Sequence, residues 1–159
     1  MKILVVSDTH GRDENLEQAV LKEHPFDMLI HCGDVEGREF YIEALAECPC
    51  TMVSGNNDFF SDLPREDELA IAGHRILISH GHYYGVSMDF SRIVDEAQSR
   101  KCDCVCFGHI HRPVLEEIDG VLVLNPGSLS FPRQRNRKPS YAVLDIQENG
   151  NISTEIRYL

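Results

Sequence analysis

The sequence predicts an α/β fold whose sheets mix parallel and antiparallel strands. In the N-terminal part, short apolar runs with strand character alternate with helical patterns. Each of these runs ends in glycine and polar residues, which is typical of parallel strands whose loops gather at one edge of a sheet. Farther along, the turn signals Asp119-Gly120 and Asn149-Gly150 separate apolar runs, which is typical of antiparallel hairpins.

The N-terminal part contains three βα-like repeats. Apolar, β-prone runs predict buried strands over Lys2–Val6, Met28–His31 and Thr51–Ser54. Helical periodicity predicts helices over Arg12–Glu23 and Arg38–Glu47, and a proline follows each of them. We expect the second helix to bury four side chains: Phe40, Tyr41, Ala44 and Leu45.

The C-terminal part is richer in strands. We expect a hairpin over Glu68–Ala72 and Arg75–Ser79, followed by a helix over Ser87–Arg100. Five further strands are expected: Cys104–Phe107, Val114–Ile118, Val121–Leu124, Tyr141–Ile146 and Ile152–Arg157. No linker, repeat or low-complexity tract interrupts the pattern, and 159 residues suffice for one substantial core. We therefore expect a single domain over residues 1–159.

The charge and hydropathy patterns exclude several functional classes. A formal net charge of −11 argues against a general nucleic-acid or membrane-surface binder, which needs a basic face, and leaves nucleotides only as small substrates. The same charge suits a protein that holds multivalent cations, although solubility alone would explain it. No stretch approaches the ~20 apolar residues of a membrane span. The apolar run at the N-terminus is too short for a signal peptide, so a cytoplasmic protein is expected.

The six cysteines form no C-x-x-C pair, so zinc-ribbon spacing is missing. Cys102, Cys104 and Cys106 alternate, which predicts that all three lie on one face of a strand. In a reducing compartment such residues are mostly small, buried apolar side chains. A redox or zinc protein built on these cysteines is the less favoured alternative.

Polar clusters follow five of the expected strands. Together they supply carboxylates, imidazoles and an amide oxygen, a mixed set that suits Mn, Fe, Ni or Zn better than a site for Mg alone. On an extended backbone His109 and His111 would point to one side, where they could serve one metal or two adjacent metals. Asp34 is central in the chain order and is a natural bridge between two ions. The clusters are Asp8-Thr9-His10, Gly33-Asp34, Gly55-Asn56-Asn57-Asp58, Ser79-His80-Gly81-His82 and Gly108-His109-Ile110-His111.

This ordered set, D-x-H, G-D, G-N-x-D, H-G-H and G-H-x-H, resembles the calcineurin-like metallophosphoesterase superfamily over nearly the whole chain. The small size, G-N-x-D in place of G-N-H-D/E, and Asn125-Pro126-Gly127-Ser128 are most similar to its YfcE-type phosphodiesterases. The resemblance implies a four-layer α-β-β-α sandwich with mixed sheets and a metal site at the C-terminal ends of the strands. It also implies hydrolysis of a small phosphodiester by a metal-bridging hydroxide.

The resemblance further assigns ligands for two divalent metal ions, with Mn expected first and Ni, Fe, Zn or Mg as alternatives. Asp8, His10 and His111 would hold the first metal. Asn56, His80 and His109 would hold the second metal, and Asp34 would bridge the two. His24, His31 and His74 match no motif and are interpreted as surface or hydrogen-bonded core histidines.

Two departures from the family pattern bear on catalysis. Asn57 stands where many members have a histidine that helps to protonate the leaving group, and Gly37 stands where phosphatase relatives have the aspartate that supports it. Asn57 can donate a hydrogen bond but cannot deliver a proton. The loss of general-acid help, typically worth ~10²–10⁴-fold, favours substrates whose leaving group needs little protonation, or slow turnover.

Other residues complete the expected site. Arg38 stands where relatives carry a phosphate-binding arginine, and His82 is expected to line the pocket. Arg133 lies in the basic loop that also carries Arg135, Arg137 and Lys138. It is either a second hydrogen-bond donor to the phosphate or part of a solvated loop. Ser128 is not expected to act as a nucleophile, because no base is matched to it.

The second functional hypothesis is a non-catalytic scaffold for protein interactions, as in the retromer subunit that shares this fold. The missing histidine–aspartate pair supports it, and the complete set of metal-ligand positions argues against it. The sequence specifies neither the natural substrate nor the physiological metal, and it leaves open whether the chain forms a homo-oligomer.

Overall fold

Two five-stranded mixed sheets form the centre of the computed structural model, which describes residues 1–159. The first sheet has the order β10-β9-β1-β2-β3, and the second has the order β4-β5-β6-β8-β7. The strands of the first sheet are β1 (Lys2–Val6), β2 (Met28–His31), β3 (Cys50–Met52), β9 (Ser140–Ile146) and β10 (Ile152–Tyr158). Those of the second are β4 (Glu66–Ile71), β5 (His74–Ser79), β6 (Cys104–Cys106), β7 (Pro113–Ile118) and β8 (Val121–Pro126).

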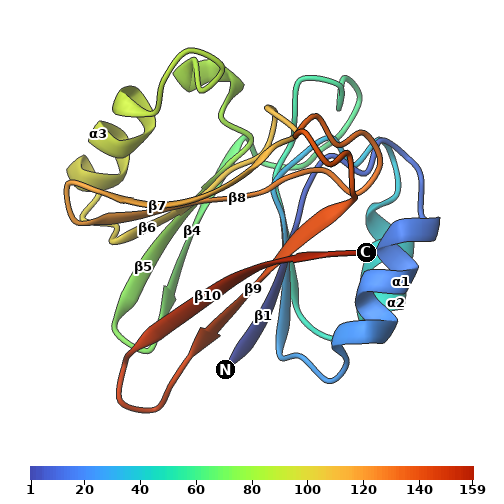
Figure 1. The fold of residues 1–159 in the computed structure, drawn as a ribbon, viewed down its shortest axis with the longest axis horizontal. Helices are drawn as coiled ribbons and strands as arrows, with labels where there is room; N and C mark the ends of the chain where they lie inside the picture. The colour runs from blue at the N-terminus through green and yellow to red at the C-terminus, as the bar shows by residue number, and fades with distance from the viewer.

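Helices cover the outer face of each sheet, which gives the predicted four-layer α-β-β-α arrangement (Figure 1). Helices α1 (Glu14–Glu23) and α2 (Glu39–Ala46) lie on the first sheet, and α3 (Ser91–Ser99) lies on the second. Alternation along β1 divides the core: Leu4 and Val6 pack toward α1 and α2, whereas Ile3 and Val5 pack between the sheets. No helix combines the length and hydrophobicity that crossing a membrane requires.

The predicted strands and helices are present, mostly with bounds shifted by one to four residues, but α2 buries a different face from the one expected. Phe40 is 87% exposed and Ala44 is also exposed, whereas Ile42 and Ala46 are buried. Six of its eight residues are apolar (EFYIEALA), so the pattern does not single out one face. Contact with β3 and α1 selects the Ile42 stripe and leaves Phe40 in solvent.

The cysteines are all free, and four of the six are buried. Cys104 and Cys106 are buried on one face of β6, as expected, and pack between the sheets, but Cys102 precedes β6 and packs on the α3 side instead. The expectation of one shared face is therefore wrong for Cys102, because the strand begins two residues later. Burial raises the pKa of the Cys32 thiol, and in Cys104 a hydrogen bond to Cys106 together with burial does the same, as expected for inert apolar side chains.

Strand register aligns the ends of the parallel strands at one edge of each sheet. In the first sheet Val6 pairs with His31 and His31 with Met52, so the chain leaves β1, β2 and β3 at the same level. In the second sheet Cys106 is paired with Ile78 and with Leu124 in the same way. The loops at both edges meet at the top of Figure 1. Short distances between side chains of these loops join all five polar clusters.

Candidate metal centre

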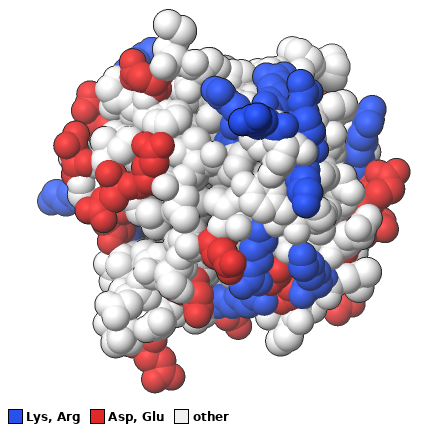
Figure 2. Space-filling view, in the orientation of Figure 1, with Lys and Arg blue, Asp and Glu red and all other residues white.

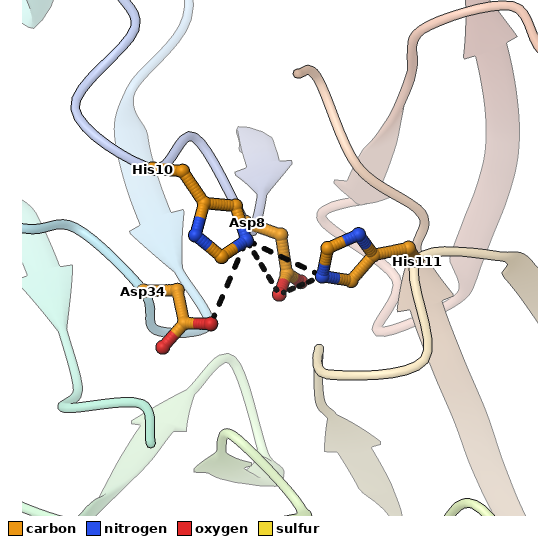
Figure 3. Close-up of side chains that lie close together, drawn as sticks. All are labelled: Asp8, His10, Asp34 and His111. Atoms are coloured by element: carbon orange, nitrogen blue, oxygen red, sulfur yellow. Dashed lines mark hydrogen bonds and ion pairs between the residues drawn. The ribbon is translucent and has the colours of Figure 1, made fainter. Parts of the chain in front are cut away.

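Four titratable side chains converge where the loops after β1, β2 and β6 meet. One ligand atom from each of Asp8, His10, Asp34 and His111 lies within 4.8 Å of the others (Figure 3). The Asp8 Oδ1 atom is 3.0 Å from His111 Nε2 and 3.8 Å from His10 Nε2. We refer to Asp8, His10 and His111 as the carboxylate half of the centre.

A second group lies on the other side of Asp34. The Asn56 Oδ1 atom is 3.0 Å from His80 Nε2 and 2.9 Å from His109 Nδ1. We refer to Asn56, His80 and His109 as the amide half. The Asp34 Oδ2 atom is 3.6 Å from His10 Nε2 and also 3.6 Å from His80 Nε2, so one carboxylate oxygen is shared evenly between the two halves.

The pair His109 and His111 does not have the extended backbone that the sequence suggested. Both residues have positive φ, 71° and 56° respectively, and lie in the loop beyond β6. As a result, the His109 ring contacts Asn56, while the His111 ring faces Asp8. The expectation of an extended pair on one side is wrong, and the two rings belong to different halves.

The carboxylate half and the shared aspartate are held in a strained backbone. Asp8, His10 and Asp34 also have positive φ (54°, 49° and 58°), a conformation that costs of the order of 1–3 kcal/mol per residue. Long-range hydrogen bonds hold it in place: Asp8 N–H donates to Gly33 O, and His10 N–H donates to Asp34 O, each at 3.0 Å. Ser128 Oγ donates to Asp8 O, so this buried hydroxyl supports the loop.

Two glycines allow the loops to approach one another closely. A Cβ atom at Gly55 would collide with the Asp34 carboxylate. A Cβ atom at Gly108 would collide with Ser7 Oγ and crowd Asp8 Oδ2. Any larger residue at either position would push a candidate ligand out of the cluster.

The donor set fits divalent metal ions. Asp8 Oδ1 is fully buried and has no hydrogen-bond partner of proper geometry, and three imidazole nitrogens lie within 3.9 Å of it, so this oxygen is available to a metal ion. Burial would raise the pKa of Asp8, but His111, His80 and Ser7 outweigh it and hold that pKa at about 2. Burial, reinforced by His80, lowers the pKa of His109. Asp8 is therefore ionised and His109 neutral at pH 7, the states that metal binding needs.

Asn57, which departs from the family pattern, binds the shared aspartate. Its backbone N–H donates to Asp34 Oδ1 at 2.9 Å, and its Nδ2 donates to Asp34 Oδ2 at 2.7 Å. These two bonds fix the carboxylate that lies between the halves. Asn57 is thus adjacent to the centre, as the motif predicted.

His82 borders the amide half, with its ring centroid 5.4 Å from that of His80 and 6.0 Å from that of His109. Its Nδ1 is buried without a hydrogen-bond partner. Arg38 is directed elsewhere: it pairs with Asp13 and lies over the Tyr41 ring. Arg133 reaches the centre through its backbone, because its N–H donates to His111 O at 2.9 Å.

Several residues at the centre were not predicted from the sequence. Glu36 Oε1 is 2.7 Å from His10 Nδ1, and the Phe131 ring packs edge-on against His10 with centroids 5.2 Å apart. The Arg12 guanidinium lies over the Phe131 ring, 4.5 Å from its centroid. Of these three residues, none belongs to a motif, so only the folded chain reveals them. Asp58 belongs to one of the motifs, but the motif does not predict its role. Its carboxylate accepts hydrogen bonds from the backbone N–H groups of Glu36 and Gly55.

His31 is a hydrogen-bonded core histidine, as its lack of a motif indicated. Its Nδ1 accepts from Gly33 N–H at 3.2 Å, and its Nε2 lies 3.0 Å from Thr9 Oγ1. It therefore supports the two loops that carry Asp8 and Asp34. Burial lowers the pKa of His31 to about 4, so it is neutral at pH 7.

Comparison with known proteins identifies the fold and the relatives. Residues 1–149 match the calcineurin-like phosphoesterase superfamily domain. The probable metallophosphoesterase YsnB of Bacillus subtilis is 37% identical over 94% of this chain and 86% of its own. The phosphodiesterase MJ0936 of Methanocaldococcus jannaschii is 30% identical over 80% of this chain and 83% of its own. The crystal structure of Vps29 of Entamoeba histolytica in complex with Zn²⁺ has a TM-score of 0.79, with 21% identity over 99% of each chain.

Proposed function

The chain belongs to the calcineurin-like phosphoesterase superfamily, and from this premise we propose that it is a two-metal phosphodiesterase that acts on small phosphodiesters. The observation that carries the proposal is the position of Asp34 Oδ2, 3.6 Å from one histidine of each half. A carboxylate placed in this way suits a bridge between two ions. Asp8, His10 and His111 would hold one ion, and Asn56, His80 and His109 the other.

Two bound divalent ions supply Lewis-acid stabilisation of the phosphate oxygens and lower the pKa of a bound water to ~7. The mixed oxygen and nitrogen donors favour Mn, with Ni, Fe, Zn or Mg as alternatives. The chain contributes the arrangement of the donors. Gly33 and Asp34 carbonyls fix the backbone of Asp8 and His10, and Asn57 fixes the Asp34 carboxylate.

Asn57 also limits the choice of substrate. Its side-chain and backbone donors are both directed at Asp34, and an amide has no proton to transfer at neutral pH. His82 is kept neutral by burial and by the nearby His80 and His109, which lower its pKa. Esters with good leaving groups, such as aryl phosphodiesters, are therefore favoured over monoesters of alcohols.

The charged groups around the centre suggest which side chains attract a phosphate substrate to it. Arg38 is engaged by Asp13, so it would have to exchange partners before it could contact a substrate. Arg12 and Arg133 flank the carboxylate half through Phe131 and His111. Figure 2 shows Lys and Arg side chains gathered over the region where the loop between β8 and β9 lies in Figure 1. This basic region attracts anions in an otherwise acidic protein.

Hydrolysis of bis(p-nitrophenyl) phosphate tests the proposal, after EDTA treatment and addition of Mn²⁺, Ni²⁺, Fe²⁺, Zn²⁺ or Mg²⁺. We expect metal-stimulated release of p-nitrophenol by the wild type. Asp34→Asn and His80→Ala should each lower kcat/KM by at least about 10³-fold, because each removes a ligand needed for charge stabilisation. Rates unchanged in both variants would contradict the assignment of the centre.

A second candidate function is a non-catalytic scaffold, given the similarity in fold to Vps29. Asn57 and Gly37, which replace the histidine–aspartate pair, are the observations that favour it. Wild-type protein that binds metal in calorimetry but hydrolyses no phosphodiester with any of the five metals would support the scaffold.

A further inference from the structure

Three phenylalanines are exposed on one side of the metal centre. Phe40, at the start of α2, is 87% exposed, and Phe59 and Phe60, in the loop after β3, are 78% and 102% exposed. All three line a single groove of about 580 Å³. Leaving a phenylalanine in water forgoes about 1.5–3 kcal/mol of burial energy, so three in one groove indicate a binding surface.

This aromatic groove borders the metal centre, because two of its lining residues contact candidate metal ligands. Asn57 lines the groove and donates two hydrogen bonds to Asp34. Glu36 lines it as well and contacts His10 Nδ1 at 2.7 Å. A phosphodiester with its phosphorus at the centre would therefore extend one of its two ester groups along the groove.

The charges of the groove restrict what it can accept. Its lining contains five carboxylates and no Lys or Arg: Glu36, Glu39, Glu43, Asp58 and Asp62. The His10 ring also packs against Phe131, on which Arg12 is stacked, and the backbone N–H of Arg133 donates to His111 O; we refer to these residues as the basic flank. An ester group with its own negative charge would be repelled from the groove and attracted to the basic flank.

We propose that the aromatic groove is a subsite that binds one ester group of the phosphodiester, and that this group is an aromatic ring without negative charge, such as an aryl group or a nucleobase. The proposal rests on the proposed phosphodiesterase function. Stacking on exposed phenylalanines supplies the affinity, and the carboxylates supply the discrimination. The basic flank would then face the other ester group.

The first experiment truncates the aromatic surface. Phe60 makes no buried contact and Phe59 little, so the double variant F59A/F60A should fold normally. With bis(p-nitrophenyl) phosphate we expect KM to rise about tenfold while kcat changes less than about twofold, since stacking is lost and the metal ligands are untouched. The matched control is Met88→Ala, an 89% exposed apolar residue outside the groove, which should leave KM unchanged.

The second experiment reverses the charge of the groove. Methyl p-nitrophenyl phosphate and methyl p-carboxyphenyl phosphate differ by an anionic group on their single ring. The variant E39K/D62K should shift the ratio of kcat/KM for these substrates toward the carboxylated one by about tenfold relative to the wild type. A ratio that does not change would mean that the ring is bound elsewhere.

The outcomes separate the two proposals. Metal-stimulated hydrolysis by the wild type together with an unchanged KM in F59A/F60A would overturn the groove as a subsite and leave the phosphodiesterase intact. No hydrolysis by the wild type with any metal would overturn the phosphodiesterase, and the groove proposal with it. A rise in KM and a shifted ratio together would establish the subsite.

Discussion

The two halves of the centre share Asp34 but differ in charge and in backbone conformation. The carboxylate half has its own buried acid, Asp8, whereas the amide half has only the neutral oxygen of Asn56. All three residues of the carboxylate half have positive φ, but in the amide half only His109 does. Charge and strain are thus concentrated on one side of a centre whose donor atoms otherwise look symmetric.

This difference predicts that the proposed two-metal centre holds its two ions with unequal strength. Affinity for a divalent cation rises with the number of charged ligands, so the carboxylate half should bind first and more tightly. The strain on that side is offset by hydrogen bonds between distant segments, including Ser128 Oγ to Asp8 O and Asp8 N–H to Gly33 O. The amide half relies instead on His80, whose Nδ1 lies 2.7 Å from Cys32 O and is fully buried.

The strongest test of this comparison is metal titration of variants from each half. In calorimetry of EDTA-treated protein with Mn²⁺, Asp8→Asn should weaken the tighter binding event by at least about 100-fold, because it removes a buried charge that faces the ion. Asn56→Ala should weaken only the second event, by about tenfold, because it removes a neutral donor.

The control for this titration is Asp95→Asn, an exposed carboxylate on α3, which should leave both events unchanged. Equal losses in Asp8→Asn and Asn56→Ala would show that the two halves bind equivalently, contrary to the comparison.

Much of the centre was predictable from the sequence because its chemistry is local to strand ends. The family resemblance carried by the five ordered motifs implied which side chains approach one another, and the strand patterns placed each motif at the edge of a sheet. The conformation of these residues was not predictable. Positive φ at Asp8, His10 and His111 is imposed by contacts with segments far away in the chain, which no local propensity reports.

The least predictable features lie around the centre rather than in it. Helix α2 is apolar on nearly all sides, so the exposure of Phe40 depended on which stripe packs against the first sheet. Glu36 and Phe131 approach His10 as single residues from separate loops, without any spacing that would mark them. The aromatic groove that we propose as a substrate subsite is therefore formed by parts of the molecule that the sequence motifs do not describe.

The buried His31, which supports the loops beneath the carboxylate half, predicts that the free energy of unfolding falls in acid. In its neutral form, His31 makes hydrogen bonds with Thr9 and Gly33. In the folded protein its pKa is about 4, below the ordinary value of 6.5. Between pH 6.5 and 4 the unfolded state binds more protons, so the stabilisation is complete above pH 6.5 and is lost as the pH falls toward 4. The full loss is up to about 3 kcal/mol.

Urea unfolding of wild type and His31→Gln at several pH values measures this loss. The difference in unfolding free energy between the two proteins should shrink as the pH falls from 6.5 to 4. Taking this difference separates the titration of His31 from that of the charged groups around it, which are Asp8, Asp34, Asp58 and His80. His24→Gln, at an exposed histidine, is the control. A difference that stays constant with pH would show that His31 is not titrating as described.

The smallest expected effect concerns Asn57, which sits on the aspartate shared by both halves. Asn57→His should raise kcat for an alkyl phosphomonoester by about tenfold, less than the usual range for general-acid catalysis, because the supporting aspartate is also missing. A Cβ atom at Gly37 would meet no other atom within 4 Å, so an aspartate fits there, although the φ of 77° adds strain of the order of 1–3 kcal/mol. N57H/G37D should therefore exceed the single variant on alkyl monoesters. If neither variant gains activity on monoesters, substrate positioning rather than proton delivery limits the reaction, and the aromatic groove becomes the place to alter specificity.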